Sequence, residues 1–151
     1  MSMVNGFTDV TRNVVGLSPR PAQVPDERCL HIGVMTGDVA ASFSAQRGHP
    51  VYPVSLPGRS VSMSIGVLEP DGRTTNHRHA YESLVLIVVG RGYTILEGRR
   101  FDWSAGDAIY TPPWCWHQHV ASTETRVEYV TSTNLPMLEA MGQTVLREEQ
   151  L

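Results

Sequence analysis

The chain of 151 residues has no lysine, and all twelve of its basic residues are arginines. Fifteen acidic residues give a formal net charge of −3, and no cluster of basic residues occurs along the sequence. A surface that binds nucleic acid or anionic lipid depends on such a cluster. We therefore expect neither a nucleic acid nor a membrane among the partners of this protein.

The sequence also lacks a long apolar run, a recognisable leader and closely paired cysteines. Its longest apolar run, residues 84–89, is far too short to cross a bilayer. The first residues, MSMVNGFTDVTRN, contain no basic segment followed by an apolar one, so no secretory signal is expected. Cys29 and Cys115 form no CxxC pair. We expect buried, reduced thiols and a cytoplasmic location.

Alternating polar and apolar residues are the main structural feature from about Val51 onward. Residues 60–68 alternate as a half-buried strand does, and residues 83–89 are typical of a more deeply buried strand. Further short strand-like stretches are GYTILE, RRFDW, DAIYT, WHQHVA and RVEYVTS, and turn sequences such as EPDGR, EGR and SAGD separate them. This spacing predicts an all-β domain, either an antiparallel sandwich or a closed barrel.

The composition and length suit one domain. Hydrophobic residues make up 41% of the chain and charged residues 18%. Residues 1–50 are expected to form an N-terminal arm, extended over RPAQVPDER, and a short helix over GDVAASFSAQRG with Asp38 near its start. Residues 51–151 are expected to form the barrel and a C-terminal helix, with Asn134 as N-cap and Pro136 in the first turn.

Two pairs of histidines stand out within the predicted strands. His77 and His79 are one residue apart, so an extended backbone directs both imidazoles to one face. His117 and His119 follow about forty residues later, and a neighbouring barrel strand could bring one of them to the same metal ion. Neutral imidazole suits iron, copper, nickel and zinc, so the type of ligand alone does not select the metal.

Two segments anchored by glycines resemble the two motifs of the cupin superfamily, over roughly residues 72–119. The matching positions are Gly72, His77, His79 and Gly90 in the first motif and Gly106, Pro112 and His117 in the second. Ser83 stands where the first motif usually has a glutamate, and Trp114 stands where the second commonly has a glycine. The resemblance implies a cupin-type antiparallel β-barrel, or jelly roll.

The sequence lacks this glutamate and contains HRH and TPPWCWHQH, and in these features it resembles the gentisate, salicylate and hydroxynaphthoate dioxygenase group of cupins. These enzymes hold ferrous iron with three histidines and usually carry two cupin domains in a longer chain. The resemblance implies that His77, His79 and His117 bind Fe(II), with Mn, Ni, Cu or Zn as alternatives. It also implies a homodimer.

Glu82 lies one residue from the usual position of the glutamate ligand. If the strand from His77 runs on without a bulge, Ser83 faces inward and Glu82 faces outward. A bulge near Ala80 would instead turn Glu82 onto the metal. We favour the three-histidine site.

Strand parity also predicts the substrate pocket. The inward-facing candidates are Tyr81, Val85 and Ile87 on the strand after His79, with Tyr129 on a neighbouring strand and Trp116 to stack on an aromatic substrate. Ordinary barrel core is the alternative interpretation of each of these residues.

Two further residues are candidates for a catalytic role. Arg73 shares the inward parity of His77, and we expect it at the rim of the pocket, where it would bind an anion. His119 shares the parity of His117, and we expect it to orient the metal site, carry a proton or contact the substrate.

The expected function is that of an Fe(II)-dependent dioxygenase acting on a small hydroxylated aromatic or enolisable acid. Three neutral imidazoles leave a divalent ion with its full charge, which favours an anionic, chelating small-molecule substrate. The alternative is a metal-containing cupin that isomerises, cyclises or only binds a small molecule, without oxygen chemistry.

Overall fold

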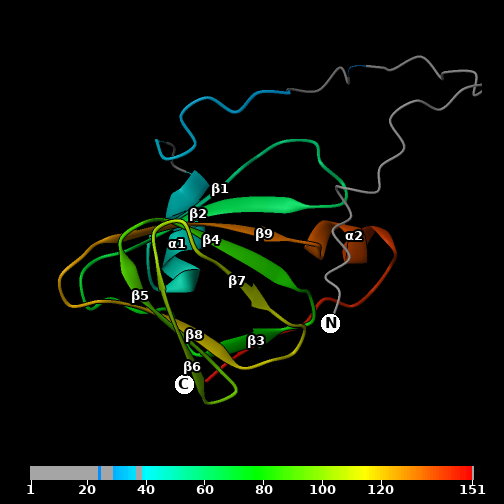
Figure 1. Ribbon diagram of the computed structural model, residues 1–151. Coiled ribbons are helices and arrows are strands. Elements are labelled where there is room, and N and C mark those ends of the chain that lie inside the picture. The colour runs from blue at the N-terminus through cyan, green and yellow to red at the C-terminus, as the bar shows by residue number, and fades with distance from the viewer. Residues whose placement is uncertain (1–23, 25–28, 37–38, 151) are drawn as a thin grey trace, which may run out of the picture.

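The structure is a computed structural model that describes Val24, residues 29–36 and residues 39–150 (Figure 1). The arm predicted over RPAQVPDER, except for Val24, lies outside the described residues, and so does Asp38. Among the described residues, no helix combines the length and the apolar character needed to cross a membrane.

Ten strands and two helices make up the described part of the chain. In chain order they are α1 (Val39–Arg47), β1 (Val51–Pro53), β2 (Ser62–Leu68), β3 (His77–His79), β4 (Ser83–Val89), β5 (Arg91–Leu96), β6 (Arg99–Ser104), β7 (Ala108–Thr111), β8 (His117–Ala121), β9 (Val127–Thr133), α2 (Leu135–Ala140) and β10 (Arg147–Glu149). The strands form two antiparallel five-stranded sheets, ordered β1-β2-β9-β4-β7 and β10-β3-β8-β5-β6, and Figure 1 shows one sheet above the other. The predicted all-β jelly roll is confirmed.

The alternating sequence of β4 shows how side chains are divided between core and surface. Ser83, Val85 and Ile87 are buried, whereas Leu84 and Leu86 between them are 59% and 46% exposed. The strand is therefore half-buried, and not the more deeply buried strand expected from its sequence. The core between the sheets consists of Leu68, Val85, Ile87, Trp103, Ala121, Val127 and Tyr129.

The segment from His77 to Val89 is divided between the two sheets. β3 pairs with β8 and β10, whereas β4 pairs with β7 and β9, so the chain passes from one sheet to the other at residues 80–82. The backbone N–H of Glu82 donates to the side-chain oxygen of Asn134 at this crossing. The predicted inward parity survives the crossing, because His79, Tyr81 and Ser83 are all buried.

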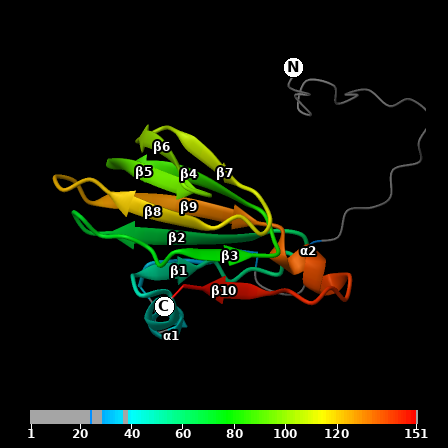
Figure 2. The same cartoon turned by 90° about the horizontal axis from the view of Figure 1, so that it is seen from below.

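Both predicted helices are present, whereas the short strands β1 and β10 were not among the predicted strands. α2 begins after Asn134 with Pro136 in its first turn, but the Asn134 side chain makes no cap hydrogen bond to the helix. The chain then continues to β10, which runs antiparallel along β3 at the edge of its sheet (Figure 2). The cysteines are not in the core, since Cys29 is exposed and Cys115 is half-buried.

Candidate metal centre and substrate pocket

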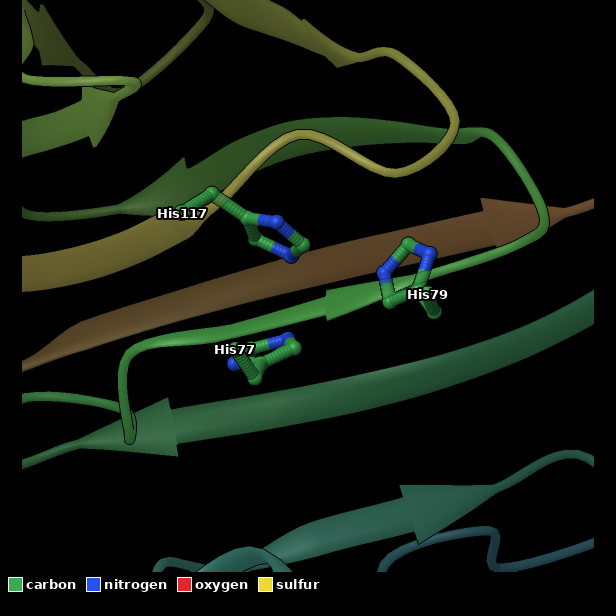
Figure 3. A group of neighbouring side chains, drawn as sticks. All are labelled: His77, His79 and His117. Atoms are coloured by element: carbon green, nitrogen blue, oxygen red, sulfur yellow. The ribbon is translucent and has the colours of Figure 1, made fainter. Parts of the chain in front are cut away.

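Three histidines from two paired strands form one cluster. His77 and His79 are the ends of β3, and His117 begins β8 directly opposite His77. Figure 3 shows the three side chains pointing toward one another. The ring centroids of His77 and His117 are 4.1 Å apart, and those of His79 and His117 are 4.8 Å apart. All three residues are buried, and they offer ring nitrogens that lie within 4.8 Å of one another.

Backbone carbonyl groups determine which ring nitrogen of each histidine is free. Each Nδ1 lies at hydrogen-bond distance from a carbonyl oxygen, which only accepts, so each Nδ1 carries the proton. The acceptors are the carbonyl groups of Thr75 for His77 (2.8 Å), Tyr81 for His79 (2.7 Å) and Cys115 for His117 (2.8 Å). The three Nε2 atoms keep their lone pairs, which is the state in which an imidazole binds a metal ion.

Burial keeps the three imidazoles neutral. Desolvation is the largest cause that lowers the pKa of His79 to about 3 and that of His117 to about 4, and it holds the pKa of His77 well below its usual value. The neighbouring His117 and the positive charge of Arg147 lower the pKa of His77 and His79 further. At neutral pH, no proton has to leave an imidazolium before a metal ion binds.

His119 is a different kind of histidine, although it also lines the cavity. Its Nδ1 lies 2.7 Å from Thr94 Oγ1, and Trp103 Nε1 donates to the same oxygen over 2.8 Å. Thr94 is fully buried, and among the hydrogen bonds of the described residues its hydroxyl proton has no acceptor other than His119 Nδ1. His119 therefore carries its proton on Nε2, and that nitrogen acts as a donor.

A cavity of about 280 Å³ adjoins the four histidines. Of the residues predicted to line a pocket, Tyr81, Val85 and Tyr129 do so. The Tyr81 ring stacks on His79, with centroids 3.8 Å apart and an angle of 5° between the planes. The residues that line the cavity include neither an aspartate nor a glutamate. No carboxylate of the lining is therefore available as a ligand to a metal ion held by the histidines.

Comparison with known proteins relates the central part of the chain to a known domain family. Residues 64–133 match the Cupin domain family. The chain has a cupin domain. The matched range begins in β2, ends in β9 and contains all four clustered histidines, whereas α1 and β10 lie outside it.

The cupin domain is similar to parts of larger dioxygenases. Gentisate 1,2-dioxygenase 1 of Aquipseudomonas alcaligenes is 31% identical over 80 residues, which are 52% of this chain and 23% of the relative. 5-Aminosalicylate 1,2-dioxygenase of a Comamonas species is 26% identical over 145 residues, or 89% of this chain and 38% of the relative. The chain thus spans well under half the length of these relatives.

Solved structures show the same fold. Salicylate 1,2-dioxygenase from Pseudoaminobacter salicylatoxidans, determined with gentisate, has a TM-score of 0.63 to this chain at 16% identity. The match covers 68% of this chain and 29% of that one. At this identity the likeness shows the fold of the cupin domain.

Three residues predicted for the site do not line the cavity of the cupin domain. Ile87 faces inward but packs in the core, farther along β4 than the pocket residue Val85. Trp116 lies outside the pocket because it has the opposite parity to His117 in the extended chain, and its ring contacts Arg78 at 4.6 Å.

Arg73 is likewise not part of the lining, because the next residue in the chain, Thr74, takes the buried position. The Arg73 guanidinium is exposed and lies 3.8 Å from Asp71, so the predicted rim cation is not at the rim.

Glu82 faces away from the cluster, as strand parity predicted. Its carboxylate accepts a hydrogen bond of 2.9 Å from the exposed Tyr110 hydroxyl, and Ser83 takes the buried position beside the pocket. The alternative of a bulge near Ala80 that turns Glu82 inward is not observed.

Trp114 shows why a glycine is common at its position in the second cupin motif. Its φ of 63° lies in the left-handed region that favours glycine. The Trp114 ring is not in the pocket but covers the Arg78 guanidinium at 4.4 Å. Packing on Arg78 therefore accompanies the strained backbone at this position.

The lining residues that were not predicted from the sequence include three with basic side chains: Arg47, His49 and Arg147. His49 accepts a hydrogen bond of 2.6 Å from the Tyr129 hydroxyl, since its Nδ1 is bound to the carbonyl of residue 47. Arg147 lies on β10, directly opposite His79. The sequence REEQ contains no apolar residue that would indicate this strand, and nothing in the sequence distinguishes the two arginines from solvated ones.

Proposed function

We propose that His77, His79 and His117 hold one divalent metal ion, ferrous iron in the working protein, and that the protein is a dioxygenase for a small hydroxylated aromatic or enolisable acid. The observation that carries the proposal is the convergence of three buried imidazoles, each with its Nδ1 bound to a backbone carbonyl, in a cavity without a carboxylate. Neutral nitrogen ligands of this kind suit Fe²⁺, and Mn, Ni, Cu or Zn are the alternatives.

The residues present fit such an ion. Bonds from imidazole nitrogen to a divalent metal are about 2.0–2.1 Å long, so modest ring rotations bring together nitrogens that now lie within 4.8 Å of one another. The carbonyl groups bound to each Nδ1 already set the tautomer of every ring. When bound, the iron would supply the redox chemistry with dioxygen.

The side chains of the pocket would bind and orient the acid. The three ligands add no negative charge, so an anionic substrate is attracted to the centre. Val85 and the Tyr81 ring give the cavity an apolar wall that excludes water from an aromatic ring. The Nε2–H of His119 would donate a hydrogen bond to a substrate oxygen, with its tautomer held by Thr94. Gentisate and 5-aminosalicylate, the acids that appear in the names of the relatives, belong to this chemical class.

The test is oxygen uptake by the iron-loaded protein across a panel of hydroxybenzoates, together with metal analysis. We expect oxygen consumption coupled to loss of the aromatic absorbance of the substrate. His117→Ala should lower the metal content steeply and abolish this uptake while the circular dichroism spectrum stays close to that of the parent, because the other core residues are unchanged.

Two results would contradict the proposal. Metal content in His117→Ala equal to that of the parent would refute the three-histidine site. Equal conversion of a substrate under strict anaerobiosis would refute the oxygenase and support a metal-containing isomerase or cyclase in its place.

The homodimer and the cytoplasmic location remain predictions from the resemblance and the composition. Leu84, Leu86 and Val88 on the outer face of β4 are 46–59% exposed and are available for contact with a second copy. Sedimentation velocity measures the oligomeric state directly.

A further inference from the structure

We propose that Arg47 and Arg147 form a carboxylate-binding site in the wall of the pocket, which selects acids over neutral analogues of the same shape. The proposal depends on the proposed function only for the identity of the natural substrate, since the anion would bind the arginines whether or not a metal is present. Both residues lie outside the matched cupin range, on α1 and β10.

Strand pairing brings Arg147 to the cavity. β10 is antiparallel to β3, with Arg147 opposite His79 and Glu149 opposite His77. Residues opposite each other in an antiparallel pair project their side chains to the same face, so Arg147 shares the inward face of the two histidines. Arg147 is accordingly part of the lining of the cavity.

Contacts on the outer face fix this register. Glu148 lies opposite Arg78 and accepts a hydrogen bond of 2.7 Å from Nε of Arg78. At the end of β10, the side-chain amide of Asn76 donates a hydrogen bond of 2.7 Å to the side-chain oxygen of Gln150. The backbone N–H of Gln150 donates a hydrogen bond of 3.0 Å to the backbone carbonyl of Asn76. A shift of one residue would turn Arg147 outward, so these contacts help keep the guanidinium in the pocket.

Arg47 reaches the same cavity from the last turn of α1. Its guanidinium lies 4.7 Å from the centre of the Phe43 ring, and no ion pair joins it to any of the described residues. Burial and the nearby charge of Arg147 lower the pKa of Arg47, whereas a hydrogen bond with Tyr81 acts in the opposite direction. Two like charges are therefore held close together beside the cavity.

The charge of the cavity is not balanced by its own lining. Arg47 and Arg147 are the charged residues of that lining, and the histidines are neutral. Glu149 accepts hydrogen bonds of 2.9 and 2.8 Å from Nε and Nη2 of Arg147 and so balances one charge from outside the lining. One positive charge remains, and the planar fork of a guanidinium matches a carboxylate in geometry. A monocarboxylate of the size of a hydroxybenzoate is therefore the class of ligand that this site would take.

The test compares 2-hydroxybenzoate with the neutral 2-hydroxybenzamide, both titrated calorimetrically into chelator-treated, metal-free protein. We expect the parent to prefer the acid, and Arg147→Gln to lose about tenfold or more of that preference, as expected for a hydrogen bond to a charged group. Arg47→Gln should act in the same direction. Glu149→Gln should strengthen binding of the acid, because it frees the Arg147 fork.

The matched control is Arg126→Gln, since Arg126 is paired with Glu69 and Glu128 on the surface and is not part of the cavity lining. This variant should keep the preference of the parent. The proposal is overturned if Arg147→Gln and Arg47→Gln both keep the preference, or if Arg126→Gln loses it equally. A protein that binds no metal but shows the expected pattern would refute the proposed function and leave this site standing.

Discussion

His77 and His119 both line the same cavity and are both buried, yet their free ring nitrogens have opposite chemistry. The Nδ1 of His77 donates to a carbonyl, which leaves a lone pair on Nε2. The Nδ1 of His119 accepts from the Thr94 hydroxyl, which leaves a proton on Nε2. Strand parity predicted that the four histidines face the interior. It is the hydrogen-bond partner of each Nδ1 that distinguishes the three proposed metal ligands from His119, which is a hydrogen-bond donor.

Replacement of Glu82 tests whether the metal site contains a carboxylate. Because the Glu82 side chain is bound to Tyr110 on the outside of the barrel, Glu82→Gln should leave the metal content close to that of the parent. His79→Ala, measured in parallel by the same metal analysis, should lose most of the metal. A collapse of occupancy in Glu82→Gln would mean that the chain bulges near Ala80 and supplies a fourth ligand.

At the scale of the elements, the strands with a period of two were predictable because their side chains separate into core and solvent faces. The predicted inward positions Val85, His117 and His119 in β4 and β8 are buried, although Val120, of the opposite parity in β8, is buried as well. The passage between sheets at residues 80–82 was not predicted, because the alternation of burial continues across it.

β10 was not predicted for a different reason. The sequence REE has little apolar content, so its pattern resembles that of a solvated tail. Its place in the sheet depends on partners about seventy residues away, among them Arg78 and Asn76. Local propensity carries no information about such contacts, and a residue delivered by β10 could not be assigned to the pocket from the sequence.

The pairing of β2 with β9 places Gly66 opposite Tyr129, where the aromatic ring covers the glycine. A Cβ at residue 66 would lie 2.1 Å from Cζ of Tyr129, so the ring would have to move. We expect Gly66→Ala to destabilise the fold by about 1–3 kcal/mol through this overpacking. Urea denaturation followed by circular dichroism measures the loss.

A double-mutant cycle identifies the cause of that loss. In the background of Tyr129→Ala, the further change Gly66→Ala should cost close to nothing, because the ring is gone. Gly58→Ala is the control, since its nearest neighbouring atom would lie at 3.4 Å, and it should be nearly neutral. An equal cost of Gly66→Ala in both backgrounds would exclude the contact with Tyr129 as the cause.

At the scale of the whole molecule, the pocket combines a cupin domain with both of its flanks. The histidines come from β3 and β8 within the matched range, whereas Arg47 and Arg147 come from outside it. The cupin motifs made the proposed ligands predictable, because their spacing is characteristic. The two arginines depend on the final packing of α1 and β10 and carry no such spacing.

Four buried neutral histidines make the stability of the metal-free protein dependent on pH. Burial lowers the pKa of His79 and His119 to about 3 and that of His117 to about 4, and the pKa of His77 is also lowered, from an ordinary value of 6.5. Below pH 6.5 the unfolded chain therefore binds more protons than the folded one, so the free energy of unfolding falls as the pH falls. The stabilisation is complete above pH 6.5.

We expect the urea midpoint of the chelator-treated protein to be constant between pH 7 and 8 and to fall steeply from pH 6.5 to about 4. Each histidine contributes a loss of up to about 1.4 kcal/mol per pH unit in this range. His79→Asn removes one of the titrating groups and should reduce the slope by roughly a fifth to a quarter, because the other three buried histidines remain, as does His49, whose pKa burial also lowers. The same slope in His79→Asn as in the parent, or an unfolding midpoint that stays constant down to pH 5, would show that these imidazoles are not held neutral by the fold.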